Sequence, residues 1–383
     1  MLPLTVWMNY PSFYQGDLFR ALAATNCVDL QVVFAKKLTP DRLQLGWEDD
    51  LRGYSYTFVN RGKVTAHAMR LAWSQRHRLH IVNGIWAEPS FTAALVALAF
   101  AGATYAIYSE APEPSLRRSI AKKALRVGVG QTLAAKAKAV FPISHLAEDF
   151  YAGLGVSKQV MYPFGYFRSE ARWLGRSGYS KQHGMIEVVF AGQLVWRKAL
   201  DLLLEAFSPL IDEYPNLRLA VIGAGEMLPT LRTQTEQMGL AERVSFEGVI
   251  PPDRIPARLS VADLLVLPSR WDGWGVVVNE AFSVGIPVIA SDQCGASDLI
   301  RDSENGYIFR SGEAKDLRVC LQKFLSQARN WPRLRAEATA TGNRISTEAA
   351  VPYLIQCLKH MMGLTEQRPS APWAELHIAQ GAD

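Results

Sequence analysis

Apolar residues gather in short runs that alternate with longer amphipathic segments along the whole chain. The runs are rich in Val, Ile and Leu without polar alternation, which is typical of strands buried on both faces of a parallel sheet. In the first half they predict strands at residues 4–8, 30–35, 79–83, 104–108, 140–144 and 159–163. In the second half they predict strands at residues 186–191, 217–222, 243–247, 263–267, 286–290 and 306–309. Alternation with helices predicts an α/β protein with two doubly wound, Rossmann-like domains.

The same pattern predicts where the domains divide. The chain of 383 residues exceeds the usual size of a single core. Residues 166–185 (YFRSEARWLGRSGYSKQHGM) contain no apolar run, so they predict a linker between a first domain at 1–165 and a second at 186–344. A final amphipathic helix is expected at about 345–362, followed by a tail without regular structure at 363–383.

One apolar stretch, residues 91–108, is uncharged and long enough to span a bilayer. It is rich in alanine, however, and Gly102 divides it. We therefore expect a buried helix at about 91–101 followed by a strand at 104–108.

Positive charge is concentrated in the first half of the chain. Residues 1–180 carry a net charge of +9 and the remainder −4, within a total of +5. Residues 115–138 contain seven basic residues and no acidic one. This run fits either a solvated basic face or a surface that contacts anionic lipid headgroups or a phosphorylated acceptor. No nucleic-acid recognition motif accompanies it, so nucleic acid is not an expected partner.

The cysteines and the N-terminus indicate the cellular compartment in which the protein is expected. Cys27, Cys294, Cys320 and Cys357 are scattered without a CxxC pair, which fits a reducing compartment and predicts neither a disulfide framework nor a thiolate metal site. The first ten residues lack the features of a signal peptide. We expect a cytoplasmic protein, with a peripheral location on the inner face of the membrane as an open alternative.

Residues 263–306 carry the most chemical information. A predicted strand leads into a loop, DGWG at 272–275, and a helix is expected to begin near Glu280. Glycines let the backbone approach a ligand closely, and a helix N-terminus offers free N–H groups to an anion. Asp272 and Glu280 flank this position with seven residues between them. An anion-binding site between two carboxylates suits a nucleotide-sugar. The diphosphate accepts hydrogen bonds from N–H groups, and the sugar hydroxyls donate hydrogen bonds to the carboxylates.

This segment resembles the sugar-donor motif of retaining glycosyltransferases of family 4, which have the GT-B fold and usually show Glu, seven residues, Glu. The resemblance implies two Rossmann-like domains facing across a cleft, with the last helix packing back on the first domain. It implies that Glu280 hydrogen-bonds the ribose hydroxyls, and that the shorter Asp272 replaces a glutamate near the donor sugar. The other substrate-binding positions that it implies here, the last three through backbone N–H groups, are Gly273, Trp274, Gly275, Val276 and Val277.

A second match is the segment IEVVFAGQLVWRKALDLLLEAF, where a predicted strand and Gly192 precede a basic pair at the start of a helix. Positive charge there favours a pyrophosphate leaving group. The resemblance equates Lys198 with the family's lysine. Gln193 occupies the usual arginine position and Ala199 the usual second glycine, so Arg197 is the candidate for the missing cation.

Two further motifs follow in the family's order. In LRLAVIGAGE, Gly223 and Gly225 permit a tight turn that either lies under a ligand or serves packing alone. In RVSFEGVIPP, the resemblance implies backbone contacts to the nucleotide base around Val249 and Ile250, with a plain strand exit as the alternative.

The first domain offers fewer signals. Family members often have two glycines in the loop after the first strand, where this chain has only Gly16 among aromatic residues. Those aromatic residues fit either a stacking surface for a sugar or lipid or an anchor for the following helix. Where many relatives have a histidine after the fourth strand, this chain has Glu110, which is either a polar group facing the acceptor or a loop carboxylate.

Together the motifs predict transfer of a sugar, with retention, from a nucleotide-diphosphate sugar to a glycan, glycolipid or small-molecule hydroxyl, in polysaccharide, lipopolysaccharide or glycolipid biosynthesis. Lys198, Arg197, Asp272 and Glu280 are the candidate catalytic residues. No DxD-type motif stands in a suitable loop, so neither a metal nor another cofactor is expected. Two alternatives stay open, because Gln193 and Asp272 depart from the family pattern: a GT-B nucleotide-sugar epimerase or hydrolase, and a catalytically degenerate nucleotide-sugar-binding protein.

Overall fold

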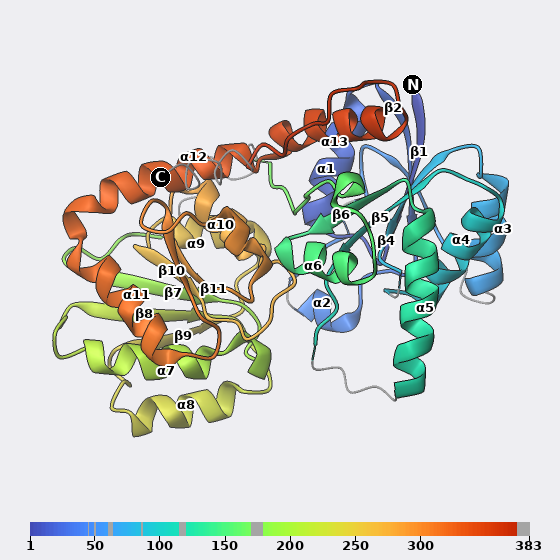
Figure 1. Ribbon diagram of the computed structural model, residues 1–383. Coiled ribbons are helices and arrows are strands. Elements are labelled where there is room, and N and C mark those ends of the chain that lie inside the picture. Colours follow the sequence, from blue (N-terminus) through green and yellow to red (C-terminus); the bar gives the residue numbers. More distant parts are fainter. Residues whose placement is uncertain are drawn as a thin grey trace. The chain divides into compact units, whose positions relative to one another are not determined.

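The computed structural model describes residues 1–44, 46–49, 51–59, 64–85, 87–114, 120–169 and 179–373. They form two compact units, each with one parallel sheet covered by helices on both faces (Figure 1). The first unit consists of Met1–Phe167 and Thr347–Pro372. The second consists of Arg168–Ser346 and the residues from Trp373 onward.

The sheet of the first unit has six parallel strands in the order β3-β2-β1-β4-β5-β6. Its strands are β1 (Leu2–Met8), β2 (Val28–Phe34), β3 (Ser55–Phe58), β4 (Leu79–Asn83), β5 (Tyr105–Glu110) and β6 (Ala139–Ile143). The central strands are buried along almost their whole length, as their apolar sequences predict.

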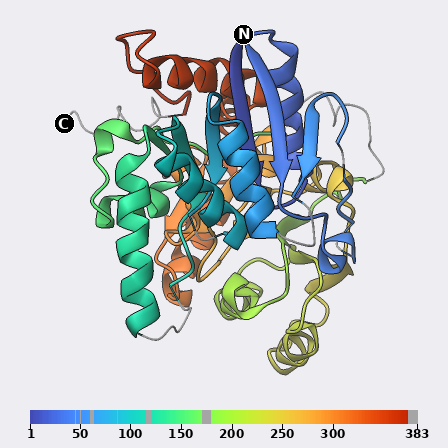
Figure 2. The same cartoon turned by 90° about the vertical axis from the view of Figure 1, so that its right-hand side faces the viewer.

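Helices cover both faces of this sheet. One face carries α3 (Val64–Ser74), α4 (Pro89–Phe100) and α5 (Ile120–Lys136), and Figure 2 turns it toward the viewer. The other carries α1 (Phe13–Ala24) and the last helix, α13 (Thr347–Met361), which packs on α1. Two shorter helices, α2 (Pro40–Gln44) and α6 (His145–Gly153), follow β2 and β6.

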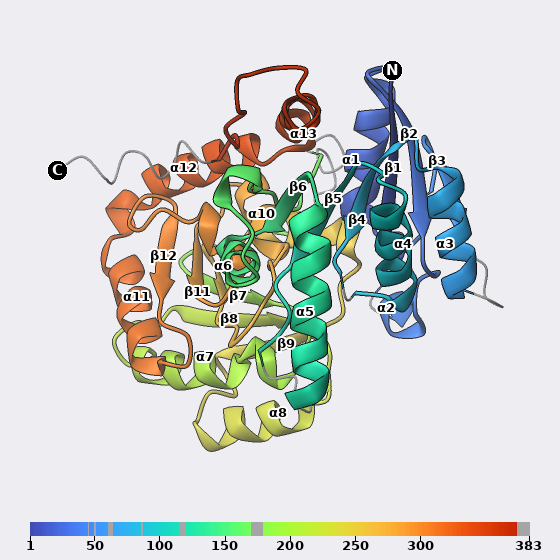
Figure 3. The ribbon, with the colours of Figure 1, turned by 45° about the vertical axis from the view of Figure 1, so that its right-hand side comes forward.

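The sheet of the second unit repeats this arrangement in the order β12-β11-β10-β7-β8-β9. Its strands are β7 (Ile186–Ala191), β8 (Leu217–Ile222), β9 (Val244–Gly248), β10 (Leu264–Leu267), β11 (Val288–Ser291) and β12 (Gly306–Phe309). Helices α7 (Leu200–Phe207), α8 (Leu228–Gln237) and α11 (Ala314–Ser326) lie on one face (Figure 3). Helices α9 (Ile255–Leu259), α10 (Val277–Ser283) and α12 (Trp331–Arg344) lie on the other.

In the first unit one strand prediction is wrong and one strand was missed. Residues 159–163 do not form a strand, because a 3₁₀ turn at Lys158–Val160 occupies them and only Met161 makes a bridge, to Val140. Conversely, β3 was not predicted, because this short edge strand is half exposed and has no continuous apolar run.

The apolar stretch at 91–108 divides into α4 and β5, as predicted. In the part of the chain that the structure describes, no helix combines the length and hydropathy needed to cross a membrane.

The chain passes between the units at two positions that are adjacent in space. Arg168 begins the second unit and Ser346 ends its main segment, and the two residues pair as a parallel bridge. Of the predicted linker, residues 170–178 lie outside the described residues. After α13 the tail has no regular structure up to residue 373, but Arg368 donates hydrogen bonds to the carbonyls of Lys158 and Gln159 at 3.0 and 2.8 Å.

Candidate active site

In the second unit the strand order reverses between β7 and β10, which lie side by side in the sheet. Open parallel sheets bind ligands at such a switch point, beyond the carboxyl ends of the strands. The loops that leave these ends are residues 192–199 after β7 and 268–276 after β10. They contain most of the positions that the sequence motifs single out, which makes this edge the candidate site.

Three charged side chains from the two loops form one cluster. The ammonium of Lys198 donates to Oδ2 of Asp272. Nη1 of Arg197 lies 4.0 Å from Oδ1 of Asp272, and its Nη2 lies 3.4 Å from Oε1 of Gln193. The stem of Lys198 passes Gly192, where an added Cβ would lie 3.9 Å from Cδ and Cε. Arg197 therefore lies beside the residue that occupies the family's arginine position.

The basic loop is fixed at both ends. Ala199 begins α7 with a left-handed backbone, φ 56° and ψ 38°, which explains why glycine is usual at this position. Arg270, after β10, donates to both carboxylate oxygens of Asp201 at 2.9 and 2.7 Å and to the carbonyl of Trp196 at 2.8 Å. These bonds fasten the loop after β10 to the start of α7.

The glycines of the GAG turn after β8 permit a close approach between two backbones. A Cβ at Gly223, where φ is +135°, would lie 1.9 Å from the carbonyl oxygen of Gly192. A Cβ at Gly225 would lie 2.3 Å from the carbonyl oxygen of Leu194. Both glycines are therefore required by packing against the loop after β7, which is the packing alternative left open for this motif.

Gly223→Ala is expected to destabilise the protein by about 3 kcal/mol or more, because the methyl group collides with backbone and the φ angle disfavours alanine. Urea denaturation measures this. Gly239→Ala is a matched control, since Gly239 also has a positive φ but no atom within 4 Å of its added Cβ. Equal losses for the two variants would show that the collision with Gly192 is not the cause.

The loop after β10 is held by the segment after β11. The N–H of Asp272 donates to the carbonyl of Gln293 at 2.9 Å, and the N–H of Gly295 donates to the carbonyl of Asp272 at 2.9 Å. Gly275 has φ +92°, and a Cβ there would lie 2.6 Å from Cδ2 of Leu267. Backbone bonds thus fix the position of the Asp272 side chain.

Trp274 is one of the predicted substrate-binding positions in this loop. Trp274 is only 2% exposed and its indole N–H donates to Oδ1 of Asn279 at 2.7 Å, so its ring belongs to the packed interior. Gly273 is followed by the turn that leads into α10. This helix begins at Val277, earlier than the predicted start near residues 279–280, so Val276 and Val277 supply N–H groups at its first turn.

Glu280 lies in the first turn of α10 and is 3% exposed. Its Oε1 lies 3.9 Å from Nη2 of Arg168, which is itself 3% exposed. Burial raises the pKa of Glu280 to about 7, although Arg168 acts in the opposite direction. Oε1 is buried and, among the described residues, accepts no hydrogen bond. Arg168 was not predicted as a site residue, since it stands in the segment that was predicted to be the linker.

Val249 and Ile250 follow β9 at the same carboxyl edge of the sheet, with β8 between β9 and β7. Val249 is 40% exposed, whereas Val244 at the start of β9 is 8% exposed. In the part of the chain that the structure describes, no group of three or more His, Cys, Asp or Glu side chains is placed to hold a metal ion.

The two candidate residues of the first unit occupy different surroundings. Gly16 lies buried inside α1, where its N–H donates to the carbonyl of Ser12 at 2.9 Å, so its expected place in a loop is wrong. Glu110 ends β5, is exposed, and accepts a hydrogen bond from the hydroxyl of Tyr166 at 2.7 Å.

The aromatic residues after β1 form a cluster around Trp47. Its ring centroid lies 5.2 Å from that of Phe13, 5.6 Å from that of Tyr14 and 6.2 Å from that of Tyr10. Phe13 is buried, while Tyr10, Tyr14 and Trp47 are partly exposed. The cluster therefore anchors α1 and also presents ring surface, so both alternatives for these residues stay compatible with the geometry.

Comparison with known proteins agrees with these features. Residues 173–342 match the family described as glycosyl transferases group 1, which covers most of the second unit. Residues 173–342 therefore carry a domain of this family, as the motifs predicted.

Named relatives match over part of their length. A GDP-mannose-dependent alpha-(1-6)-phosphatidylinositol monomannoside mannosyltransferase of Mycolicibacterium smegmatis is 31% identical over 37% of this chain and 39% of its own. A D-inositol 3-phosphate glycosyltransferase of Nocardia farcinica is 34% identical over 40% of this chain and 36% of its own. The matched segments thus span well under half of these relatives.

Solved structures match over nearly the whole chain. Anabaena Alr3699/HepE in complex with UDP superposes with a TM-score of 0.75, covering 94% of this chain and 100% of its own at 15% identity. A glycosyltransferase from Rickettsia africae ESF-5 gives a TM-score of 0.73, covering 95% and 100% at 11% identity. Two Rossmann-like domains of the GT-B fold are thereby confirmed.

Proposed function

We propose that this protein is a retaining glycosyltransferase that moves a sugar from a nucleotide-diphosphate sugar to a hydroxyl group. The observation that carries the proposal is the cluster of Lys198, Arg197 and Asp272 at the switch point of the second sheet. A leaving nucleoside diphosphate gains negative charge in the transition state, and fixed cations at that position stabilise it.

The geometry of the loops supports the following roles. Lys198 and Arg197 bind the diphosphate, together with backbone N–H groups at Gly275, Val276 and Val277. Asp272 pairs with Lys198 in this structure and neutralises its charge. When the diphosphate takes over this cation, Asp272 is released to accept hydroxyl groups of the donor sugar.

Glu280 is assigned to the ribose. A buried carboxylate oxygen without a hydrogen bond is costly, and a ribose hydroxyl supplies the missing donor. The backbone at Val249 and Ile250, at the same edge, is assigned to the nucleotide base. We propose that these protein groups meet the charge of the diphosphate without a metal ion or another cofactor.

The relatives support a choice of substrates to test. The named ones are a GDP-mannose-dependent enzyme and an inositol phosphate glycosyltransferase, and HepE was solved with UDP. We propose a GDP- or UDP-hexose donor and a polyol or glycolipid acceptor in glycan or glycolipid biosynthesis. The basic segment at 115–138 supports an acceptor that carries phosphate or lies at an anionic membrane surface on its cytoplasmic side.

Thermal unfolding with UDP, GDP and ADP tests the donor site. One of these nucleotides, at about one hundred times its dissociation constant, is expected to add roughly 2.7 kcal/mol of stability to the wild type. Glu280→Ala is expected to lose most of this gain, while Glu205→Ala, an exposed carboxylate on α7, is expected to keep it. EDTA in the buffer removes divalent ions from the comparison. If no nucleotide stabilises the protein at millimolar concentration, the donor site is wrongly assigned.

A further inference from the structure

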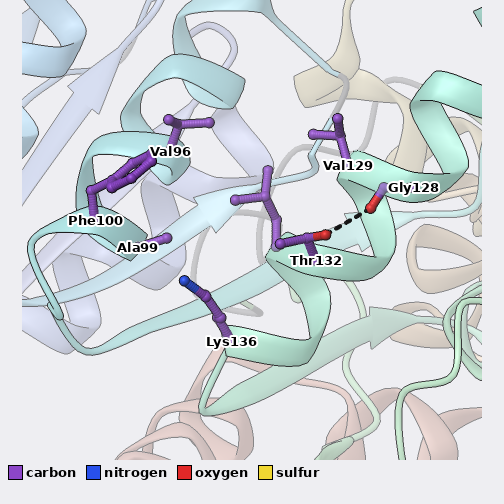
Figure 4. Close-up of a pocket in the computed structure, with 8 residues that line it drawn as sticks. Val96, Ala99, Phe100, Gly128, Val129, Thr132 and Lys136 are labelled. Atoms are coloured by element: carbon purple, nitrogen blue, oxygen red, sulfur yellow. Dashed lines mark hydrogen bonds between the residues drawn. The ribbon is translucent and has the colours of Figure 1, made fainter.

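An apolar groove lies between the end of α4 and the second half of α5 in the first unit (Figure 4). It encloses about 510 Å³, a volume within the usual range of small-molecule sites. The walls are formed by Val96, Ala99, Phe100, Val129 and Leu133.

Gly128 lines the groove and contributes no side chain to its wall. A Cβ at Gly128 would meet no atom within 4 Å, so this part of α5 leaves open space. Across the groove, Phe100 is 83% exposed at the last position of α4. The hydroxyl of Thr132 donates to the carbonyl of Gly128 at 2.9 Å, so this polar group is satisfied within the helix. A hollow lined by apolar side chains and open to solvent is a candidate site for an apolar ligand.

The charge beside the groove is positive. Lys136 lines it at the end of α5, and Lys138 is exposed two residues later. Residues 115–138 contain seven basic residues and no acidic one. An occupant that complements this surface therefore combines an alkyl chain with an anionic group.

We propose that the groove holds an acyl chain of an anionic membrane lipid, with Lys136 facing its phosphate. A single inserted chain binds a membrane only marginally, and stable attachment takes a chain together with a polybasic patch. The groove supplies the first contribution, and the basic residues of the segment 115–138 supply the second. The groove lies where α4 ends and before β5 begins, whereas Glu110 ends β5 at the opposite edge of the sheet. Within the first unit the lipid site is therefore separate from Glu110, the candidate acceptor residue.

Binding of dansyl-undecanoate, a fluorescent anionic alkyl probe, tests the groove directly in the full-length protein. We expect saturable binding with enhanced fluorescence, weakened at least about tenfold by Gly128→Leu, because the added side chain fills the groove. Gly153→Leu is the matched control: Gly153 also lies in a helix of the first unit with open space at its Cβ. Equal affinities of the two variants would overturn the proposal.

Vesicle flotation tests whether the bound acyl chain belongs to a membrane lipid. The wild type and Gly153→Leu are expected to float with vesicles of equal parts phosphatidylcholine and phosphatidylglycerol, and not with phosphatidylcholine alone. Gly128→Leu is expected to float less, although its charge is unchanged, and Lys136→Glu also less. Flotation of Gly128→Leu equal to the control, or a wild-type dimer that Gly128→Leu dissociates in size-exclusion chromatography, would contradict the proposal. Stabilisation by the nucleotide is expected to be the same in all these variants.

Discussion

Lys198→Ala is expected to lower kcat/KM for sugar transfer by about 100- to 1000-fold, the usual effect of removing one group that stabilises developing negative charge. The side chain is largely buried and already fixed against Asp272, so it acts without reorganisation in a site shielded from water. The measurement is steady-state transfer from the nucleotide-sugar that stabilises the wild type most.

Arg197→Ala serves as the matched comparison. Arg197 lies farther from Asp272, at 4.0 Å, and 32% of its side chain is exposed, so solvent screens its charge more. We expect a loss of about tenfold for this variant. Equal activity of Lys198→Ala and the wild type would show that Lys198 does not stabilise the leaving group.

The second large effect is expected at Arg168. Arg168→Met leaves Glu280 buried without this cation, and loss of one partner of a buried pair costs about 3–5 kcal/mol. At pH 8, where Glu280 is ionised in the wild type, urea denaturation is expected to show the full cost. At pH 5 the carboxyl group is protonated, because its pKa is about 7 in the folded protein, and the cost is expected to be smaller.

The sign of this pH dependence follows from the raised pKa. The folded state holds the proton of Glu280 more tightly than the unfolded state, so the stabilising contribution is full below about pH 4.5 and is lost as pH rises through about 7. Glu280→Gln should abolish this component of the pH dependence. Arg329→Met, an exposed control in the same unit, should change neither curve. A cost for Arg168→Met that is the same at pH 5 and pH 8 would show that Glu280 is not its partner.

Most of the fold followed from the sequence because parallel strands buried on both faces need continuous apolar runs. The two exceptions have separate causes. β3 is a half-exposed edge strand, so its sequence alternates and gives a weak signal. Residues 159–163 are apolar for another reason: Met161 and Tyr162 are buried under the surrounding structure without joining the sheet.

The site was predictable where its residues belong to one loop or to neighbouring strands. Lys198 and Asp272 are 74 residues apart, but strands β7 and β10 bring their loops together at the switch point. Arg168 was not predictable, because its contact with Glu280 depends on how the chain enters the second unit. Gly16 was misplaced by one turn, since α1 begins at Phe13 and includes it.

The pairing of Arg168 with Ser346 determines how the two units can be produced as separate polypeptides. The main segment of the second unit is continuous between these residues, so residues 168–346 can be expressed as a single fragment. The first unit needs α13, which packs on α1 and whose Tyr353 donates to the carbonyl of Pro163 at 2.8 Å. Since parallel paired strands lie only about 4.8 Å apart, a few glycines suffice to join residue 167 to residue 347. Excision of the second unit would then leave the first as one uninterrupted chain.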